Sequence, residues 1–521
     1  MSKSLFPNYG IVTLNDNSTL YFSIKGQIVV DSQEQSAEFP VREAGVFSNF
    51  FVYVSANDTT TVSSTVKLRK NGANTAILVT IASGATGVFE DTTNTASCTN
   101  TDEVVYEFNV PNETVAAAVT IKTTSIEFAT TATGNCLSIM GTAGAVGSSI
   151  ASQISYSHLS GSCSIVDTNS ALSKYRVRQT FTSRNLFVRV SANGRTTDTT
   201  FRTEKNGSNG TQSVTYGSTE TGIKEDTTNT DSLIAGDDYQ FEVVTGTGSG
   251  TITHTIMAVT FINTNGHFVM LSAYQVSQNL GAASTNYSGI SGRLIPITSP
   301  EANTQVYPRF TLAVKELGVY VTTNSNGTGT FTVMVRDNGT DSPVQVVFAA
   351  GETGLKTDTS NVSDIAGGTD EINYKLVNTG DGAAWVTWIG TMGIAGYTVV
   401  ATTGTFTLTG NPTASLAGRR LLITQLGSFQ LIGNNAKLTR LYKLISGLGT
   451  FTLTGNTIIF NMGKSIFGGL GVFVLTGVAS NQIKTYKLLV PTSVYFVTGR
   501  PTEFSSVIPG TIIFVEVGVD V

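Results

Sequence analysis

Residues 65–81, TVKLRKNGANTAILVTI, decide the fold of this chain. Apolar and polar residues alternate on both sides of Asn71-Gly72, which is the two-residue period of a β-strand with one buried face. An Asn-Gly pair between two such runs is a strong hairpin signal, because a type I′ turn requires positive φ at both central residues. The stretch therefore predicts an antiparallel hairpin.

The hairpin belongs to a longer series of residues that occurs three times in the same order. The series is Arg42, Asn57, Asn71-Gly72, Gly87, Asp91 and Asn94, then Arg178, Asn193, Asn206-Gly207, Gly222, Asp226 and Asn229, then Arg309, Asn324, Asn338-Gly339, Gly354, Asp358 and Asn361. In every copy 15 residues separate the arginine from the first asparagine, and 20 separate the turn asparagine from the aspartate. Agreement at so many positions establishes an internal repeat.

Composition favours strands in all three copies. Hydrophobic residues make up 40% of the chain and charged residues only 13%, about half the roughly 25% of an average globular chain. Threonine and valine, which fill much of the repeat, favour strands because their branched Cβ packs well on a pleated surface. Each copy contains seven or eight short strands between polar turns, so we expect an all-β chain with three tandem homologous β-sandwich domains of jelly-roll type.

A second, shorter repeat follows the third copy. GTFTLTG at residues 404–410 recurs as GSFQLIG at 427–433, GTFTLTG at 449–455, GVFVLTG at 471–477 and SVYFVTG at 493–499. Each unit of about 22 residues predicts two short strands, too few to bury a core alone, so stacked units would form a solenoid or a prism-like array. The ending TIIFVEVGVDV, residues 511–521, is expected to be a terminal strand that covers the last unit.

These two repeats divide the chain into five expected segments. They are an N-terminal arm at residues 1–30, β-sandwich repeats at 31–131, 150–264 and 272–396, and a C-terminal β-repeat domain at 400–521. Each sandwich is long enough to bury a core of its own. Deletion of the C-terminal β-repeat domain is therefore expected to leave three folded domains with separate cores.

Charge and cysteine content exclude several classes of partner. The net charge of −5 gives no basic surface for nucleic acid, and no apolar run approaches the length of a membrane span. The cysteines Cys98, Cys136 and Cys163 lie in unrelated contexts, which argues against a disulfide framework and fits a reducing cytoplasm. The first residues lack the apolar stretch of a signal peptide, so a soluble chain without N-terminal export is expected.

Residues suited to catalysis do not gather in any known motif. His158, His254 and His267 lie outside nucleophile-elbow, HExxH and Cys-x-x-Cys contexts. A lone histidine on a strand is far more often a surface or cross-strand residue than a catalyst. We therefore expect no catalytic residue, no metal ligand and no cofactor.

One polar motif has two interpretations. Residues 90–94, EDTTN, recur at 225–229 and, as TDTSN, at 357–361. Carboxylate and amide oxygens suit a calcium ion, whereas short polar side chains at a strand junction equally form Asx and Ser/Thr turns. Because the third copy has lost the glutamate and carboxylates are few, we favour the turn.

Two further sets of residues carry hypotheses. Arg42, Arg178 and Arg309 recur, and each is expected to hold a carboxylate or loop carbonyls within its own domain. Trp385 and Trp388 would line a sugar groove if the chain were a polysaccharide-cleaving enzyme with paired carboxylates. Residues three apart on a strand face opposite sides, so one tryptophan is expected in the core.

The combination of SAN, KNG and TGxxEDTTNT motifs with tandem GTFTLTG units resembles virion proteins of tailed bacteriophages, many of them described as fibre-like. The first motif set covers residues 42 to about 395 and the second residues 404 to 499. The resemblance implies a particle component made in the host cytoplasm and assembled without secretion. It carries no catalytic signature.

Four functions are compatible with these features. The first is a non-enzymatic tail-fibre or spike-type appendage for host attachment, and the alternative is a capsid decoration protein that stabilises the head shell. A bacterial adhesin and a polysaccharide depolymerase are the other two. Expected partners are other virion proteins, copies of the chain itself in a homotrimer, and a host surface glycan or protein. The sequence assigns no binding residues.

Overall fold

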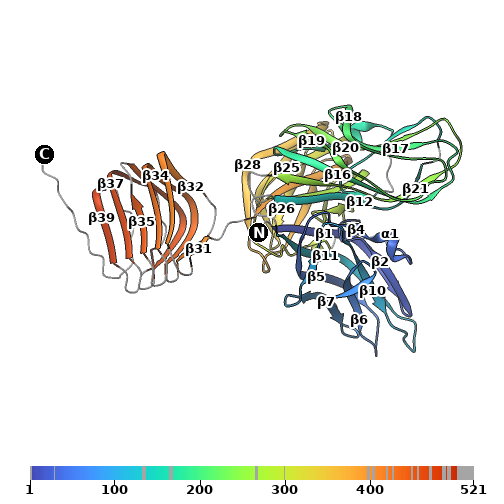
Figure 1. Ribbon diagram of the computed structural model, residues 1–521, viewed down its shortest axis with the longest axis horizontal. Helices are drawn as coiled ribbons and strands as arrows, with labels where there is room; N and C mark the ends of the chain where they lie inside the picture. Colours follow the sequence, from blue (N-terminus) through green and yellow to red (C-terminus); the bar gives the residue numbers. More distant parts are fainter. Residues whose placement is uncertain are drawn as a thin grey trace. The chain divides into compact units, whose positions relative to one another are not determined.

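The computed structural model describes residues 3–501, apart from 28–29, 132–135, 149, 163–167, 264–267, 298–299, 396–398, 402–404, 418–420, 425–427, 447–449, 455–456, 469–471, 484–487 and 490–493. Beyond residue 395 only the path of the backbone is described. The chain divides into two compact units, Met1–Ala395 and Gly396–Val521 (Figure 1). Regular structure is almost entirely strand, which confirms the all-β fold class.

The first sandwich contains two sheets and one short helix. Its elements are β1 (Lys3–Asn15), β2 (Ser18–Phe22), β3 (Gly26–Gln27), α1 (Glu34–Ala37), β4 (Phe39–Pro40), β5 (Gly45–Asn57), β6 (Ser64–Lys70), β7 (Ala73–Ile81), β8 (Gly87–Asp91), β9 (Ala96–Cys98), β10 (Glu103–Val110) and β11 (Ala118–Thr130). One sheet has the order β3-β1-β11-β5-β8 and the other β2-β10-β6-β7. Within these sheets the four-strand orders β1-β11-β5-β8 and β2-β10-β6-β7 are those of a jelly roll.

The second and third sandwiches repeat this order. The second contains β12 (Cys136–Ser148), β13 (Ile154–Ser157), β14 (Gly161–Ser162), η1 (Ser170–Leu172), β15 (Tyr175–Arg176), β16 (Phe181–Asn193), β17 (Thr199–Lys205), β18 (Ser208–Tyr216), β19 (Gly222–Leu233), β20 (Asp238–Thr245) and β21 (Ile252–Asn263). The third contains β22 (Phe268–Leu280), β23 (Ser284–Ser288), β24 (Gly292–Arg293), η2 (Glu301–Thr304), β25 (Leu312–Asn324), β26 (Thr330–Asp337), β27 (Thr340–Ala349), β28 (Gly354–Ile365), β29 (Ile372–Asn378) and β30 (Ala384–Ala395). Their sheets are β14-β12-β21-β16-β19 with β13-β20-β17-β18, and β24-β22-β30-β25-β28 with β23-β29-β26-β27.

The hairpin predicted from the sequence is present in every copy. Asn71 and Gly72 have φ values of 50° and 77° and join β6 to β7. The asparagines and glycines at 206–207 and 338–339 also have positive φ. The two-residue turn matches the twist of the strands it connects, which is why the Asn-Gly pair recurs.

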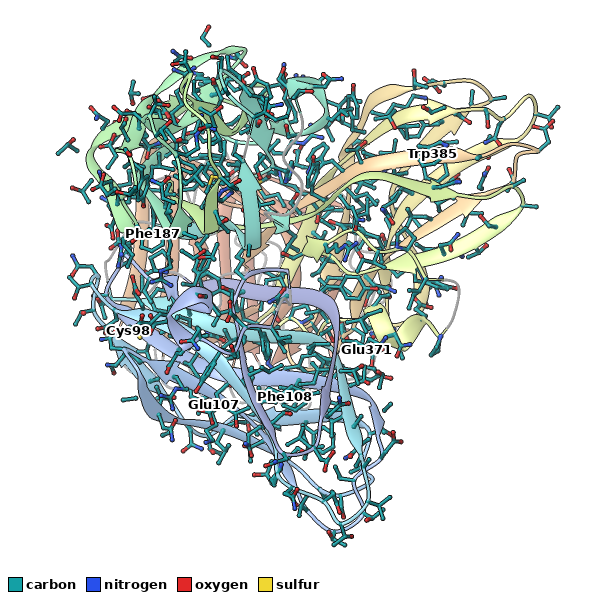
Figure 2. All side chains as sticks on the ribbon, turned by 90° about the vertical axis from the view of Figure 1, so that its right-hand side faces the viewer. Cys98, Glu107, Phe108, Phe187, Glu371 and Trp385 are labelled. Atoms are coloured by element: carbon teal, nitrogen blue, oxygen red, sulfur yellow. The ribbon has the colours of Figure 1, made fainter. Side chains whose placement is uncertain are left out.

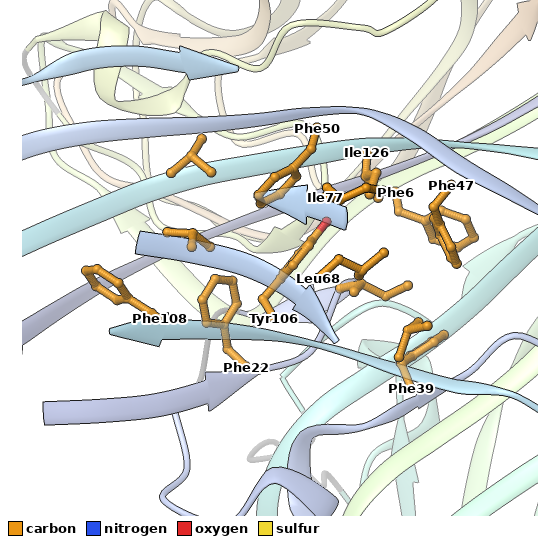
Figure 3. Close-up of a cluster of buried hydrophobic side chains, with 14 of the residues drawn as sticks. Phe6, Phe22, Phe39, Phe47, Phe50, Leu68, Ile77, Tyr106, Phe108 and Ile126 are labelled. Carbon is orange, nitrogen blue, oxygen red and sulfur yellow. The ribbon is translucent and has the colours of Figure 1, made fainter. Parts of the chain in front are cut away.

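The interior of each sandwich is apolar and rich in aromatic side chains. In the first sandwich Phe47 and Phe128 lie 4.6 Å apart between ring centroids, and Phe50 stacks on Tyr106 at 4.8 Å (Figure 3). In β6 buried Ser64, Val66 and Leu68 alternate with half-buried Thr65, Lys67 and Arg69. Full burial of one such ring contributes roughly 1.5–3 kcal/mol, so the core supplies most of the stabilisation.

The domain boundaries differ from those expected at the N-terminal side of each repeat. Residues 1–30 were expected to form an arm, but β1 pairs with β11 and β2 pairs with β10. The second sandwich likewise starts with β12, before the expected residue 150, and β22 starts before residue 272. The first strand of each copy was missed because no landmark residue precedes the recurring arginine.

The three sandwiches form a closed ring. Their first strands, β1, β12 and β22, contact one another, and so do the short strands β3, β14 and β24. The remaining contacts are cyclic, because β3 meets β12, β14 meets β22 and β24 meets β1. One chain thus builds an approximately threefold arrangement of three jelly rolls.

The C-terminal unit is a stack of parallel strands, β31 (Val399–Ala401), β32 (Thr405–Ala417), β33 (Leu421–Thr424), β34 (Ser428–Ser446), β35 (Thr450–Thr454), β36 (Thr457–Gly468), β37 (Val472–Ile483), β38 (Leu488–Leu489) and β39 (Val494–Pro501). Thr405 pairs with Ser428, which pairs with Thr450, and Val472 continues the series to Val494. Each step equals the sequence repeat, which is the arrangement of a solenoid. Residues 511–521, the expected terminal strand, lie outside the described residues.

Within the part of the chain that the structure describes, no helix is long and apolar enough to cross a membrane.

Candidate functional site

The recurring aspartate of the EDTTN motif is fully occupied by hydrogen bonds within its own domain. Asp91 accepts bonds from the backbone N–H groups of Leu78, Thr93 and Asn94 and from the Asn94 side chain. The same bonds form at the other two copies, around Asp226 and Asp358. Burial alone would raise the pKa of Asp91, but these donors outweigh it and hold the pKa below its usual value.

The motif is therefore a turn that also ties two strands together. The described residues contain no group of three or more His, Cys, Asp or Glu side chains that could hold a metal ion. The turn interpretation explains why the aspartate and asparagine recur, since both side chains satisfy backbone groups that the strand junction leaves unpaired. The calcium interpretation has no support in this geometry.

The other recurring asparagines have similar structural roles. Asn71 bonds through its amide to Asp102 and accepts the N–H of Glu103, which fixes the hairpin turn to β10. Asn57 donates to the carbonyls of Ala82 and Ala85, joining the loops at the far end of the sandwich. Equivalent bonds recur at Asn206, Asn338, Asn193 and Asn324.

Two of the three histidines are buried. His254 is completely buried and stands 5.3 Å from Phe201 between ring centroids, inside the second sandwich. His158 is also completely buried and stacks on Tyr274 of the third sandwich at 4.6 Å. Burial lowers the pKa of His158 to about 3 and that of His254 to about 4. His267 lies outside the described residues.

The two tryptophans and the described cysteines lie in different surroundings. Trp388 is 2% exposed and Trp385 is half-buried, so one of the pair lies in the interior, as the strand period predicted. Cys98 is buried and free, and burial raises its thiol pKa to about 12, which makes it a weak nucleophile. Cys136 lies in β12, and Cys163 falls outside the described residues.

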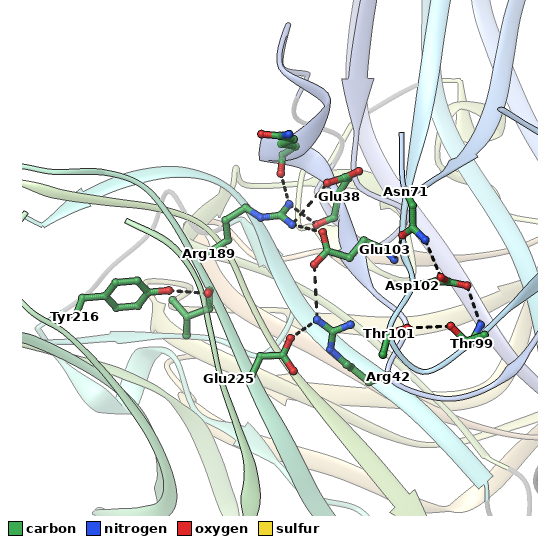
Figure 4. A network of polar contacts seen from close by, with 12 residues as sticks. Glu38, Arg42, Asn71, Thr99, Thr101, Asp102, Glu103, Arg189, Tyr216 and Glu225 are labelled. Atoms are coloured by element: carbon green, nitrogen blue, oxygen red, sulfur yellow. Dashed lines mark hydrogen bonds and ion pairs between the residues drawn. The ribbon is translucent and has the colours of Figure 1, made fainter. Parts of the chain in front are cut away.

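Two of the three recurring arginines form ion pairs between sandwiches, which corrects the expectation that each acts within its own domain. Arg42 of the first sandwich forms an ion pair with Glu225 of the second (Figure 4). Arg309 of the third forms the equivalent pair with Glu90 of the first, at 2.6 Å. Glu90 and Glu225 are the first residues of their EDTTN motifs. Each glutamate pairs with the arginine of the preceding sandwich in the ring, where the third sandwich precedes the first.

Each arginine ends a short segment that lies against the outer face of the next sandwich. The segments are residues 39–42, 175–178 and 306–309. We call their contacts the first joint (first to second sandwich), the second joint (second to third) and the third joint (third to first). Figure 2 shows Phe187 at the boundary of the first and second sandwiches.

The first joint is a network of charged residues. Arg42 lies over the Phe187 ring at 5.1 Å, and Arg189 donates to the carbonyls of Gln35 and Glu38 and to the Glu103 carboxylate. Burial, together with the nearby charge of Glu103, raises the pKa of Glu38 to about 7. The joint therefore contains an acidic group that titrates near neutrality (Figure 4).

The third joint combines hydrogen bonds with ring packing. Thr123 and Ser125 of β11 donate 3.0 Å bonds to the carbonyls of Gln305 and Tyr307. The Tyr307 ring lies 4.9 Å from Phe51. The Arg309 side chain, 3% exposed, then reaches Glu90. This joint connects the last sandwich to the first.

The second joint lacks the carboxylate found in the other two. Thr357 stands where the EDTTN glutamate is expected, and among the described residues no carboxylate forms an ion pair with Arg178. The Nε and Nη2 atoms of Arg178 are buried without a hydrogen-bond partner. Burial lowers the pKa of Arg178, and only the Tyr175 and Glu316 charges oppose that effect.

Trp388 fills the space at this joint. Its indole lies 6.0 Å from the Arg178 guanidinium and 5.6 Å from the Tyr175 ring. Gly318 and Gly390 make room for it, because a Cβ on either glycine would overlap the indole. The other two sandwiches carry Phe51 with Ser125 and Phe187 with Ala258 at the positions of these glycines. The third sandwich therefore lacks the glutamate of the motif and places the Trp388 ring at this joint.

The cores also continue across the joints. Leu5 of the first sandwich packs in the core of the third, and Phe187 of the second packs in the core of the first. Tyr274 and Trp388 of the third pack in the core of the second. The expectation of separate cores is therefore wrong for the ring, whose apolar interior is shared.

Comparisons with known proteins add no family. No protein-family model matches this chain, and the search of curated proteins finds no match.

Proposed function

We propose that this chain is a non-enzymatic structural protein of a bacteriophage particle, displayed on its surface as part of a tail-fibre or spike-type appendage used in host attachment. The single observation that carries the proposal is the closed ring, in which one chain builds three jelly rolls with arginine–glutamate ion pairs at two of the three joints. The polar residues that recur in every copy serve the fold and the joints, which is what a structural part requires.

The loops at one end of each sandwich support a role in contact with other molecules. In the first sandwich Glu113 accepts hydrogen bonds from the backbone N–H groups of Thr60, Thr61 and Val62, which lowers its pKa to about 2. In the third, Asp381 accepts equivalent bonds from Gly327 and Thr328. Loops fixed in this way present a preorganised surface, which lowers the entropic cost of binding.

The solenoid supports a projecting part. Parallel strands stacked at a constant step can extend without forming a closed core, and a rod of this kind suits an appendage. The ring and the solenoid follow each other in one chain, so assembly of the two requires no second gene product. Homotrimer formation, host glycan or protein binding, and location in the virion remain parts of this proposal.

Immunogold electron microscopy of intact particles tests the proposal. Antibody against residues 1–395 is expected to label the tail or its tip, and antibody preadsorbed with the purified chain serves as the control. Absence of the chain from purified particles would overturn the proposal. Release of reducing sugar from host capsule or lipopolysaccharide would overturn the non-enzymatic assignment.

A second candidate is a decoration protein of the capsid, favoured by the threefold arrangement of the ring. One chain with three equivalent faces would match a local threefold position of a shell, where a symmetric trimer otherwise fits. Copy number distinguishes the two candidates. Hundreds of chains per particle, with gold over the head, support decoration, whereas a few to tens of chains support an appendage.

A further inference from the structure

The three joints occupy equivalent positions in the repeat but contain different ionisable side chains. The first and third joints contain an arginine–glutamate ion pair across the boundary. The second joint instead encloses Arg178, whose Nε and Nη2 lack partners, and the fully buried His158. Buried cations without a partner carry a large desolvation cost.

His158 lies at the boundary itself and not inside one sandwich. Its ring stacks on Tyr274 of the third sandwich with an interplanar angle of 6°, and lies 5.8 Å from Tyr175 and 6.2 Å from Trp388. The next segment is tied across the same boundary, since the Ser160 hydroxyl donates a 2.6 Å bond to the Ser272 carbonyl.

Among the residues that the structure describes, only one nitrogen of the His158 ring has a hydrogen-bond partner. Nδ1 bonds to the backbone of Ser160, whereas Nε2 is buried without a partner. An imidazolium donates from both nitrogens. Protonation in the closed ring would therefore leave one charged N–H unsatisfied.

The charged and titratable groups around this position do not compensate for a new cation. The segment at residues 175–178 contributes Tyr175, Arg176 and Arg178, and β22 contributes Tyr274. From β25 the Glu316 carboxylate acts on Arg178, but it lies 3.6 Å from Lys315. β30 contributes the neutral Trp388.

We infer that the second joint is an acid-sensitive opening point, at which the ring separates between its second and third sandwiches while the other two joints stay closed. The inference goes beyond the proposed function and does not depend on it. Opening exposes His158 to water, where it accepts a proton without penalty, and it also solvates Arg178.

The other joints respond differently to the same change of pH. In the first joint the carboxyl of Glu38 gains its proton first, because burial and the charge of Glu103 raise its pKa to about 7. Its protonation removes a repulsion within the closed joint. The third joint contains the Arg309–Glu90 ion pair and, among the residues that the structure describes, no histidine. Moderate acid therefore acts selectively on the second joint.

The size of the effect follows from proton linkage. The closed-state pKa of His158 is about 3, against about 6.5 for an exposed histidine. Lowering the pH from about 7.5 to about 4.5 then favours the open state roughly 100-fold. An opening that is rare at neutral pH becomes measurable in acid.

Hydroxyl-radical footprinting of the full chain at several pH values tests the inference, because it measures the solvent exposure of the side chains buried at each joint. Oxidation of Tyr175, Tyr274 and Trp388 at the second joint is expected to rise between pH 7.5 and 4.5, as the open state gains roughly 100-fold. Phe187 at the first joint and Phe51 at the third serve as internal controls. An equal rise at all three joints, or none at the second, would overturn the inference.

Two variants separate the role of His158 from general acid lability. His158→Ser places the residue that stands at the equivalent position 23 of the first sandwich, and it should abolish the pH response of the second joint. His254→Val changes a buried histidine within the second sandwich and should leave that response intact. A pH response retained in His158→Ser contradicts the inference. If that variant does not fold, the comparison among the three wild-type joints still decides.

Discussion

Arg309 donates a 2.6 Å hydrogen bond to Glu90, a residue that precedes it by 219 positions in the chain. This ion pair connects the last sandwich to the first. Joining segments so distant costs loop-closure entropy, although that cost grows only slowly with length. The packing of Tyr307 on Phe51 and of Leu5 in the third core offsets it. The pair therefore marks the contact that closes the ring.

Removal of the Arg309 side-chain charge should weaken that closure. Arg309→Met is expected to lower the free energy of unfolding by about 2 kcal/mol, because it removes a hydrogen bond between charged groups at a buried position. Urea unfolding of residues 1–395 measures the change. Arg176→Met, at a more exposed ion pair with Asp238, is the matched control and should cost less than about 0.5 kcal/mol. Equal effects of the two substitutions would contradict the role assigned to Arg309.

Restoring the missing carboxylate should stabilise the second joint. Thr357→Glu places the side chain of the first two copies opposite Arg178, and we expect a gain of about 1 kcal/mol in unfolding free energy. Thr357→Gln has the same shape without the charge and should give a smaller gain. Thermal unfolding of both variants, compared at low and high salt, checks the ionic origin of the difference. A Thr357→Glu variant less stable than Thr357→Gln would exclude an equivalent geometry at this joint.

The buried His254 should make the second sandwich sensitive to acid. Its folded-state pKa is about 4, so between about pH 6.5 and pH 4 the unfolded chain binds a proton that the folded chain does not. Stability therefore falls as the pH falls through that window, by about 3 kcal/mol in total. His254→Val, which introduces the residue found at the equivalent Val386, should remove this dependence. The urea midpoints of the wild type and the variant at pH 7.5 and 4.5 measure this dependence. If both midpoints change equally with pH, His254 is not a neutral buried imidazole in the folded chain.

Glu38 should produce the opposite pH dependence in the first joint. Its folded-state pKa is about 7, so between its ordinary value and pH 7 the folded chain holds a proton that the unfolded chain has lost. The stability this proton provides is complete below about pH 4.5 and is lost as the pH rises through 7. Glu38→Gln should therefore be more stable than the wild type at pH 8.5 and similar to it at pH 4.5. Urea midpoints of the wild type and Glu38→Gln at pH 8.5 and 4.5 provide the test. Glu220→Gln, at an exposed position, is the control and should show no such gain at pH 8.5.

Truncation should distinguish the ring from its parts. Residues 1–395 are expected to fold as a monomer, because all three joints close within one chain. Residues 1–263 should be less stable and prone to association, since removal of the third sandwich exposes apolar side chains of the first and second cores. Size-exclusion chromatography with light scattering measures both. A well-folded monomer of residues 1–263 would show that the cores are independent after all.

The repeats and their turns were predictable because the signals are local. Asn71-Gly72 specifies its turn through two positive φ values, and the alternation around it fixes which face is buried. The aspartate of the EDTTN motif was correctly favoured as a turn residue, since its partners lie within its own domain and mostly within three residues. The 22-residue period of the C-terminal repeat equally appears as the step between parallel strands.

The roles of the arginines were not predictable, because their partners lie in another copy. Arg42 and Glu225 stand 183 positions apart, and nothing near either residue indicates the other. One signal was present in the sequence, namely that the arginine recurs in all three copies while the glutamate of the motif is lost only in the third. This pattern fits an arginine–glutamate ion pair between copies. The glutamate missing from the third copy then leaves the arginine of the second copy without its partner.

The sequence by itself determined the strands, their hairpins, the threefold repetition and the change of period near residue 400, because periodicity and turn chemistry act between neighbouring residues. Only the tertiary structure decided that β1 and β2 complete the first sandwich, that the three sandwiches close into a ring, and that Trp388 replaces an ion pair at the second joint. Those features depend on which surfaces meet, and burial and charge pairing between distant segments leave no periodic trace in the chain.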